Sequence, residues 1–332
     1  MQQQKENFRV QQWVVAVAVM LFVMKLAAWY ITKSVSILTD ALESTVNVIS
    51  GFIGLYSLYI AAKPRDIDHP YGHGKAEFIS AAVEGTLIMI AGLIIIYESI
   101  NHFIRPRPLQ QLDKGMLLIG ISAVVNYIMG FIAIKRGRAN SSLALVASGK
   151  HLQSDTYSTI GILSGIALIY FTGVQLIDGI VAIIFSFFII YTGYHILRAS
   201  LAGIMDEADQ ELLEQMVGRI NEARRQNWTD LHNLRVIKYG SVLHVDCHLT
   251  VPWYLNVYEA HAEVDALSQL IRKEFGTSIE LFVHTDGCLD LSCPICMKAD
   301  CPVRRHPFRQ KIEWNSAIVR SNERHRFENE SI

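Results

Sequence analysis

The sequence predicts an α-helical membrane protein with six transmembrane helices, followed by a smaller soluble domain that mixes helices and strands. The chain has 332 residues, of which 51% are hydrophobic and only 18% are charged. Nearly all the long apolar runs lie in about the first 200 residues, whereas the remainder has the periodicity of a soluble domain. We therefore expect a membrane domain over residues 1–206, a soluble domain over residues 207–290 and an extension over residues 291–332.

Six apolar runs are long enough to cross a bilayer, because a spanning helix needs about 20 mainly apolar residues. They cover approximately Trp13–Ile31, Ser36–Ala62, Phe78–Ile100, Met116–Ile134, Leu143–Phe171 and Leu176–Leu201. No small-residue cleavage site accompanies the first run, so we expect it to remain as a membrane helix. Basic residues in the loops after the second and fourth runs favour a cytoplasmic location for these loops and for both termini. Three basic residues between the third and fourth runs weaken that bias.

The soluble part has the pattern of a helix, two strands, a helix and a strand. These elements are predicted at Glu207–Gln226, Asn233–Tyr239, Val242–Val251, Tyr258–Phe275 and Ser278–His284. Gly240 and Ser241 mark a hairpin turn between the first two strands. This order predicts a two-layer α+β domain with both helices on one face of a sheet. The polar stretch from about Asn315 onward predicts a disordered tail.

Polar residues interrupt the second and fifth apolar runs. Asp40, Glu43 and Asn47 are spaced three and four residues apart, so a helix presents them on one face. His151 and Asp155 are four residues apart and share a face of the fifth run. A charged side chain at membrane depth costs about 2.5–3.5 kcal/mol on insertion scales, so these residues indicate a functional site.

Glu43, Asn47, His151 and Asp155 together offer carboxylate, amide and imidazole ligands, which suit a tetrahedral divalent ion such as zinc. Iron(II), cobalt or manganese would accept the same donors. Hydrogen bonding between the helices is the alternative use of these side chains. Asp40 lies one turn nearer the outer end of its helix, and the sequence leaves open whether it is a further ligand or a residue at a water-filled mouth.

Two further groups of residues have metal-ligand chemistry. Asp66, His69 and His73 lie in the glycine-containing loop after the second run, and their types and short spacing predict a second metal site, with an ordinary polar turn as the alternative. Four cysteines with the spacing Cys-x4-Cys-x2-Cys-x4-Cys follow the last predicted strand, at Cys288, Cys293, Cys296 and Cys301. This spacing is compatible with one tetrahedral zinc, and reduced cysteines in a loop are the alternative.

Three separated motifs resemble those of the cation diffusion facilitator family of metal/proton antiporters. They are Ser34-Val-Ser-Ile-Leu with the polar residues that follow it, Asp68-His-Pro-Tyr-Gly-His-Gly-Lys-Ala-Glu77, and His151-x-x-x-Asp155. The resemblance covers the chain to about residue 290. It implies six spans and a cytoplasmic ferredoxin-like (metallochaperone-like) domain.

The resemblance also implies roles for individual residues. Glu43, Asn47, His151 and Asp155 take the positions of the transport site, and Asp66, His69 and His73 those of a loop site. A binuclear cytoplasmic site would use His232, His248, His261, His284 and Asp286. A salt bridge between Lys75 and Asp206 would lie at the hinge between the two parts. The chain departs from its bacterial zinc and iron relatives on the second run, where those usually carry two aspartates or a His/Asp pair.

The implied function is secondary active efflux of divalent cations from a bacterial cytoplasm in exchange for protons, by alternating access. Zinc is the expected cation, with iron(II), manganese, cobalt or cadmium as alternatives. We expect a multi-pass homodimer in the lipid bilayer, activated by cytoplasmic metal, with no organic cofactor and no nucleic-acid partner. A metal sensor that does not transport would lack the membrane ligands, whereas this sequence has both the membrane and the soluble sets. A metalloenzyme would need an open coordination position and a general base, and the sequence shows no base or nucleophile constellation beyond the ligands themselves. We therefore expect a transporter and not an enzyme.

Overall fold

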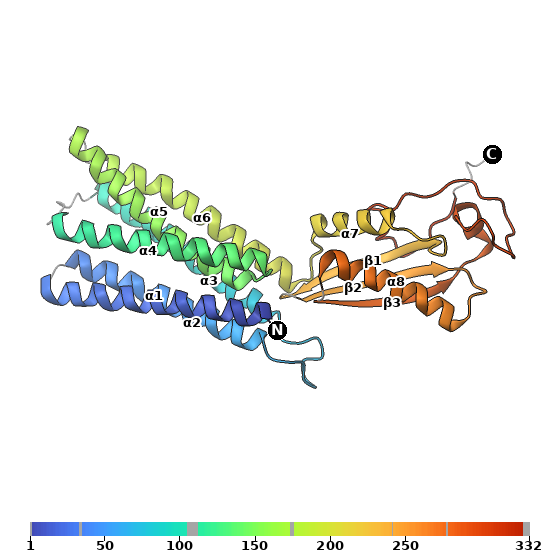
Figure 1. The fold of residues 1–332 in the computed structure, drawn as a ribbon. Helices are drawn as coiled ribbons and strands as arrows, with labels where there is room; N and C mark the ends of the chain where they lie inside the picture. Colours follow the sequence, from blue (N-terminus) through green and yellow to red (C-terminus); the bar gives the residue numbers. More distant parts are fainter. Residues whose placement is uncertain are drawn as a thin grey trace. The chain divides into compact units, whose positions relative to one another are not determined.

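The computed structural model describes residues 2–32, 35–104, 112–172, 176–240, 242–276 and 278–327. The chain divides into two compact units, Met1–Met205 and Asp206–Ile332. The first unit is helical, and the second contains a small sheet with helices on it (Figure 1).

Six long helices form the first unit, and each has 27 to 31 residues. Their bounds are α1 Gln2–Thr32, α2 Val35–Ala61, α3 Ala76–Ile104, α4 Leu112–Ala139, α5 Leu143–Thr172 and α6 Leu176–Ile204. Even the shortest is about 40 Å long, which exceeds the bilayer core of about 30 Å. Within the described residues, three stretches meet both length and composition criteria for a span, namely Gln4–Ala27, Ala76–Asn101 and Ile180–Ile204.

Glycines allow the closest helix contacts in this bundle. A Cβ atom on Gly130 of α4 would lie 2.7 Å from the carbonyl oxygen of Gly149 on α5, and one on Gly149 would lie equally close to Gly130. Gly85 of α3 and Gly193 of α6 approach each other in the same way, at 2.9 and 2.8 Å. Small residues at helix interfaces let backbones approach closely, which is how membrane helices associate without a hydrophobic driving force.

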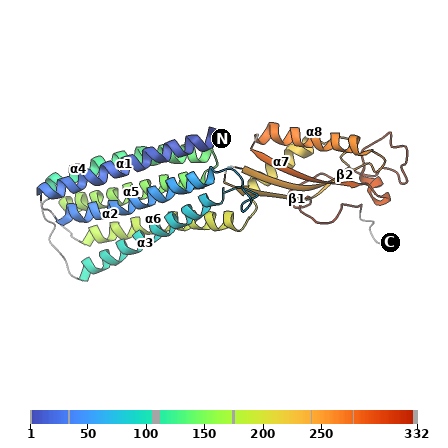
Figure 2. The same cartoon turned by 90° about the horizontal axis from the view of Figure 1, so that it is seen from below.

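The second unit contains the predicted order of helices and strands. Its elements are α7 Gln210–Glu222, β1 Asp230–Tyr239, β2 Val242–Val251, α8 Val257–Phe275 and β3 Ile279–Gly287, followed by a short 3₁₀ helix, Asp290–Ile295. The predicted hairpin is confirmed, because β1 and β2 pair antiparallel and turn at Gly240 with φ +60°. β3 returns parallel to β2 after α8, so the sheet order is β1-β2-β3. Both helices lie on one face of the sheet (Figure 2).

A β-bulge in β1 decides which side chains face away from the helices. His232 pairs with His248, but Arg235 pairs with Asp246, so β1 contains one extra residue between these pairs. Asn233 lies there with φ +51°, a left-handed conformation that asparagine tolerates better than most residues. The extra residue lets both Leu231 and Leu234 enter the core, while His232 stays on the opposite face.

The C-terminal segment is ordered and belongs to the core of this unit. Trp314 and Val319 are 4% and 0% exposed and pack in the same cluster as the strands and both helices. The backbone N–H groups of Asn233 and Leu234 donate to the carbonyl oxygens of Ser321 and Val319. The predicted disorder from Asn315 onward is therefore wrong as far as residue 327, because a few apolar anchors outweigh the polar composition. We call residues 313–327 the C-terminal strap.

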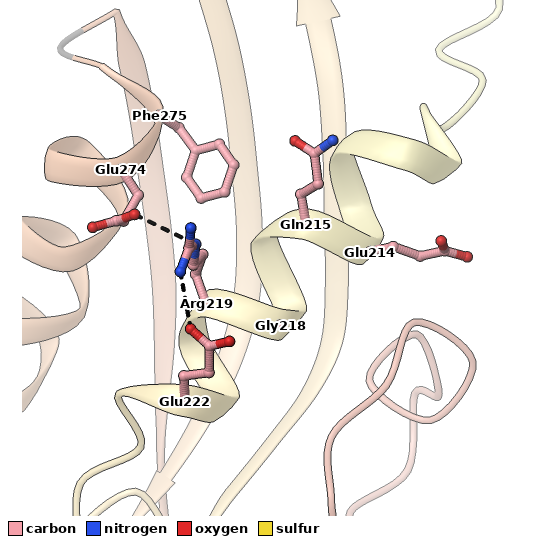
Figure 3. Close-up of a pocket in the computed structure, with 7 residues that line it drawn as sticks. All are labelled: Glu214, Gln215, Gly218, Arg219, Glu222, Glu274 and Phe275. Carbon is pink, nitrogen blue, oxygen red and sulfur yellow. Dashed lines mark hydrogen bonds and ion pairs between the residues drawn. The ribbon is translucent and has the colours of Figure 1, made fainter.

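The two helices of this unit also meet at a surface hollow. Arg219 of α7 lies 3.1 Å from Glu222 and 3.5 Å from Glu274 of α8 (Figure 3). The remaining lining residues are Glu214, Gln215, Gly218 and Phe275. Exposed ion pairs contribute about 0–1 kcal/mol. The hollow carries none of the predicted metal ligands.

Candidate metal centres

Two of the predicted membrane ligands meet inside the helical bundle. The Asn47 amide on α2 donates to the Asp155 carboxylate on α5 at 2.5 Å. His151, one turn earlier on α5, is 7% exposed, and its Nδ1 has no hydrogen-bond partner among the described residues. A buried polar atom without a partner costs about 1–3 kcal/mol, so a bound cation would satisfy it. The side chains of Asp40 and Glu43 lie outside the described part of the structure.

A second polar network, which the sequence did not reveal, joins four helices one turn before His151. Ser148 of α5 donates to Oε1 of Glu84 on α3 at 2.7 Å. The Gln11 amide on α1 donates to Ser148 at 3.0 Å and to the carbonyl oxygen of Gly51 on α2 at 3.1 Å. Glu84 and Gln11 are both fully buried. The network therefore connects the helices that carry the predicted transport ligands with α1 and α3.

The loop between α2 and α3 brings its three predicted ligands together. The donor atoms of Asp66, His69 and His73 lie within 4.8 Å of one another. His69 donates its backbone N–H to Asp66 Oδ1 at 2.7 Å, and His73 Nε2 lies 3.4 Å from Oδ2. Gly72 has φ +91°, which few residues other than glycine adopt, so the turn requires it. Burial raises the pKa of Asp66, but hydrogen bonds from His69 outweigh it and hold the pKa below its ordinary value.

The helix-free face of the sheet carries the cytoplasmic candidate. Strand pairing aligns His232, His248 and His284 in one row across the three strands. The adjacent row consists of Asp230, Thr250 and Asp286. Alternate residues of a strand share a face, so both rows project to the same side.

Within this cluster, the donor atoms of His232, His248 and Asp286 lie within 4.8 Å of one another. Asp286 Oδ2 lies 3.5 Å from His232 Nε2 and 3.4 Å from His248 Nδ1. Its Oδ1 lies 3.5 Å from His284 Nε2. The Asn233 side chain hydrogen-bonds Nε2 of His248 at 3.1 Å, which leaves Nδ1 to face the carboxylate. Imidazole nitrogens and carboxylate oxygens are the ligands that zinc prefers, so the donor set fits a zinc ion.

Asp230 contacts His232 of this cluster, and the strap residue His325 contacts Asp230. Sequence reasoning missed both residues. Asp230 Oδ2 lies 3.4 Å from His232 Nδ1, and Oδ1 lies 2.6 Å from His325 Nδ1. A carboxylate on the remote nitrogen of a histidine orients it for metal binding. Burial raises the pKa of Asp230, but hydrogen bonds from His232 and His325 outweigh it and hold the pKa far below its usual range. Burial and the neighbouring His232 lower the pKa of His248, which favours the neutral, metal-binding form.

The other predicted residues lie apart from these clusters. His261 is on α8, which covers the opposite face of the sheet; its imidazole is 71% exposed and 3.7 Å from Asp265. Lys75 donates to the carbonyl oxygen of Ile204, at the end of α6, at 3.3 Å. Asp206 begins the second unit and has φ +57°.

The cysteine-containing turn is ordered and its thiols are free. Arg304 donates to the carbonyl oxygens of Cys293 at 2.9 Å and Cys296 at 3.1 Å, which fixes the Cys-x-x-Cys turn. Burial raises the pKa of Cys288, and so do the thiols of Cys293, Cys296 and Cys301. Within the described residues, the four sulfur atoms are not among the sets whose donor atoms lie within 4.8 Å of one another.

Comparison with known proteins agrees with this architecture. Residues 12–205 match the model of the cation efflux transmembrane domain, and residues 208–288 match that of the cytoplasmic domain of cation efflux proteins. An uncharacterised transporter of Synechocystis is 32% identical over 80% of this chain and 86% of its own length. The cation-efflux pump FieF of Pectobacterium atrosepticum is 29% identical over 82% of this chain and 89% of its own length. The chain therefore belongs to the cation diffusion facilitator family. It is a membrane protein and a cation efflux transporter of this family.

Proposed function

We propose that the chain exports a divalent cation, zinc by preference, from the cytoplasm in exchange for protons. One observation carries the proposal: the Asn47 amide meets the Asp155 carboxylate at 2.5 Å inside the bundle, one helical turn from the buried, unsatisfied Nδ1 of His151. Carboxylate, amide and imidazole donors on facing helices suit a borderline divalent ion. Glu43 is the proposed fourth ligand, and Asp40 is a candidate for a further one.

All six long helices are proposed to span the bilayer of a bacterial cytoplasmic membrane, with both termini in the cytoplasm. The length of each helix supports this, and so do the basic loops after α2 and α4. The cation would enter from the cytoplasm and leave on the other side after the helices rock about the site. The transporter would act as a homodimer.

Proton exchange follows from the chemistry of the ligands. Imidazole and carboxylate must be deprotonated to hold a metal, so cation binding releases protons. His151 is the proposed main proton carrier because imidazole titrates near neutral pH. In the outward-open state, protons would displace the cation from His151 and Asp155.

The cytoplasmic cluster and the α2–α3 loop are proposed to bind regulatory divalent metal, most simply zinc. His232 Nε2, His248 Nδ1 and Asp286 Oδ2 would hold one ion, and the loop trio another. His284 faces the other oxygen of Asp286. His261 faces away from the cluster in its own chain, so it would join a metal site only from a second protomer. We also propose a salt bridge between Lys75 and Asp206. A zinc ion bound by the four cysteines is a further proposal.

The transport proposal is tested by zinc flux into proteoliposomes under an imposed pH gradient, with iron(II), manganese and cobalt compared in parallel. His151→Ala is expected to abolish proton-coupled flux. His195→Ala is the matched control, because His195 is an exposed histidine on α6 whose ring makes an edge-to-face contact with Tyr191. If His151→Ala vesicles still exchange protons in step with zinc, the proposed role of His151 is wrong.

A further inference from the structure

The strap places a fixed positive charge on the carboxylate at the centre of the cytoplasmic cluster. Arg324 Nη2 lies 2.7 Å from Asp286 Oδ1, and Nη1 donates to the carbonyl oxygen of Gly287 at 3.1 Å. The Asp286 side chain is only 12% exposed. Charge-assisted hydrogen bonds of this kind are among the stronger ones in proteins, and the planar guanidinium holds both contacts in one geometry.

The two oxygens of Asp286 have different surroundings. Oδ2 faces the ring nitrogens of His232 and His248. Among the described residues, no strap side chain contacts this oxygen. Oδ1 faces His284 Nε2 and is already occupied by Arg324. A metal must approach a carboxylate oxygen to about 2.0–2.2 Å. A cation held by Oδ1 and His284 would therefore compete directly with the guanidinium.

The strap is held in this position by contacts that do not depend on metal. Trp314 is buried in the core and lies against the Arg224 guanidinium, whose Cζ is 3.8 Å from the ring centroid. His325 donates its backbone N–H to Asp230 Oδ2 at 2.9 Å. These contacts position the Arg324 side chain next to the Asp286 carboxylate. The strap also lies beyond residues 208–288, the part that matches the family's cytoplasmic domain.

We propose that Arg324 is a built-in counter-cation that limits the cytoplasmic cluster to one tightly bound divalent metal per chain. The first ion takes His232, His248 and Asp286 Oδ2. A second ion, held by Asp286 Oδ1 and His284, binds only when it displaces Arg324. The strap thus sets the cytoplasmic metal concentration at which the second position fills. This inference rests on the proposed metal-binding function of the cluster.

Zinc titration of the full-length protein in detergent against a chromophoric chelator tests the inference. Arg324→Gln and Arg324→Met both remove the charge and are expected to add one zinc per chain, or to tighten one weak zinc by about 10- to 100-fold, the factor that corresponds to a hydrogen bond to a charged group. Arg320→Gln is the matched control: Arg320 is an exposed strap arginine that contacts Gln210 at 3.3 Å, and its loss should leave the titration unchanged. Adding His284→Ala to Arg324→Gln should remove the gain.

Two outcomes separate a failure of this inference from a failure of the site itself. His248→Ala should lower the zinc count of the wild-type chain. If His248→Ala does so while both neutral Arg324 variants titrate as wild type or bind less zinc, the cluster binds metal and the role of Arg324 is refuted. If His248→Ala leaves the zinc count unchanged, the cytoplasmic metal site is wrong and the inference is lost with it.

Discussion

Replacing Trp314 by alanine should release the strap from the second unit. Trp314 is 4% exposed in the core, and its backbone N–H donates to Asn221 Oδ1 at 3.2 Å. Truncation of a buried tryptophan typically costs about 3–5 kcal/mol through lost burial and the cavity that remains. Part of this cost is the loss of the contact with Arg224. The Arg224 guanidinium itself is held in place, because it donates to the carbonyl oxygens of Thr229 at 2.6 Å and Ile312 at 2.7 Å.

Hydrogen exchange of the full-length protein, read by mass spectrometry, measures this loss locally. About 1.4 kcal/mol corresponds to a tenfold change in an equilibrium constant, so Trp314→Ala should speed exchange of the strap amides by roughly 100-fold or more. The amides of Asn233 and Leu234 should follow, because they donate to carbonyl oxygens of the strap. Exchange within the membrane helices should not change.

Trp253→Ala provides the matched control, since the Trp253 side chain is 60% exposed. Surface substitutions usually stay within about 0.5 kcal/mol, so strap exchange should change by no more than about threefold. If Trp314→Ala has as little effect on the strap amides as this control, the strap is not held by its tryptophan, and the basis for positioning Arg324 is removed.

Three further predictions, one of them with a control substitution, test the bundle and the soluble unit. Asn47→Leu should abolish zinc flux, because it removes the amide that contacts Asp155 at 2.5 Å; flux at the wild-type rate would exclude Asn47 as a ligand. Gly54→Ala should destabilise the bundle by about 1–3 kcal/mol in thermal unfolding. Its Cβ would lie 2.7 Å from the buried Gln11 amide nitrogen, and moving that nitrogen would break its hydrogen bonds to Ser148 and to the Gly51 carbonyl oxygen. Gly120→Ala should be tolerated, because its Cβ would have no atom of the described residues within 4 Å. Asp209 caps α7, and although burial raises its pKa, hydrogen bonds from Lys238 and Leu212 outweigh it and lower the pKa overall. Asp209→Ala should therefore cost about 1 kcal/mol at neutral pH. The difference should begin to shrink as the pH falls through the unfolded-state pKa of about 3.9, and it should be lost below the lowered folded-state pKa; equal α7 exchange in both proteins at pH 7 would refute this.

The sequence predicted those features that depend on periodicity or on local spacing. The six apolar runs became six long helices, and the α-β-β-α-β order of the soluble part follows from its amphipathic and alternating patterns. The loop ligands Asp66, His69 and His73 lie within eight residues, so a single turn brings them together. The sequence grouped Asn47 with Asp155 because polar side chains that are costly in a bilayer are expected to share a site. No local pattern states which helices face each other, so the contact itself is seen only in the structure.

The order of the strap was not predicted, because its polar composition indicates disorder whereas a few buried side chains hold it in place. A stretch with many arginines and glutamates reads as disordered, yet burial is decided by individual side chains. A few anchors, Trp314 and Val319 among them, are enough to fix the segment. Once it is fixed, the charged residues between and beyond the anchors acquire partners, and Arg324 and His325 become part of the cytoplasmic cluster.

The spacing of apolar residues around Asn233 contains a signal for the bulge. Leu231, Leu234 and Val236 are all apolar, but a regular strand would point Leu231 to one face and the other two to the opposite face. One inserted residue resolves the conflict, and asparagine is among the few that accept the required backbone conformation. The predicted strand began only at Asn233, after the conflict, and so left out His232. Because a shift of one residue exchanges the two faces of a strand, the bulge allows His232 to share a row with His248 and His284 while both leucines stay in the core.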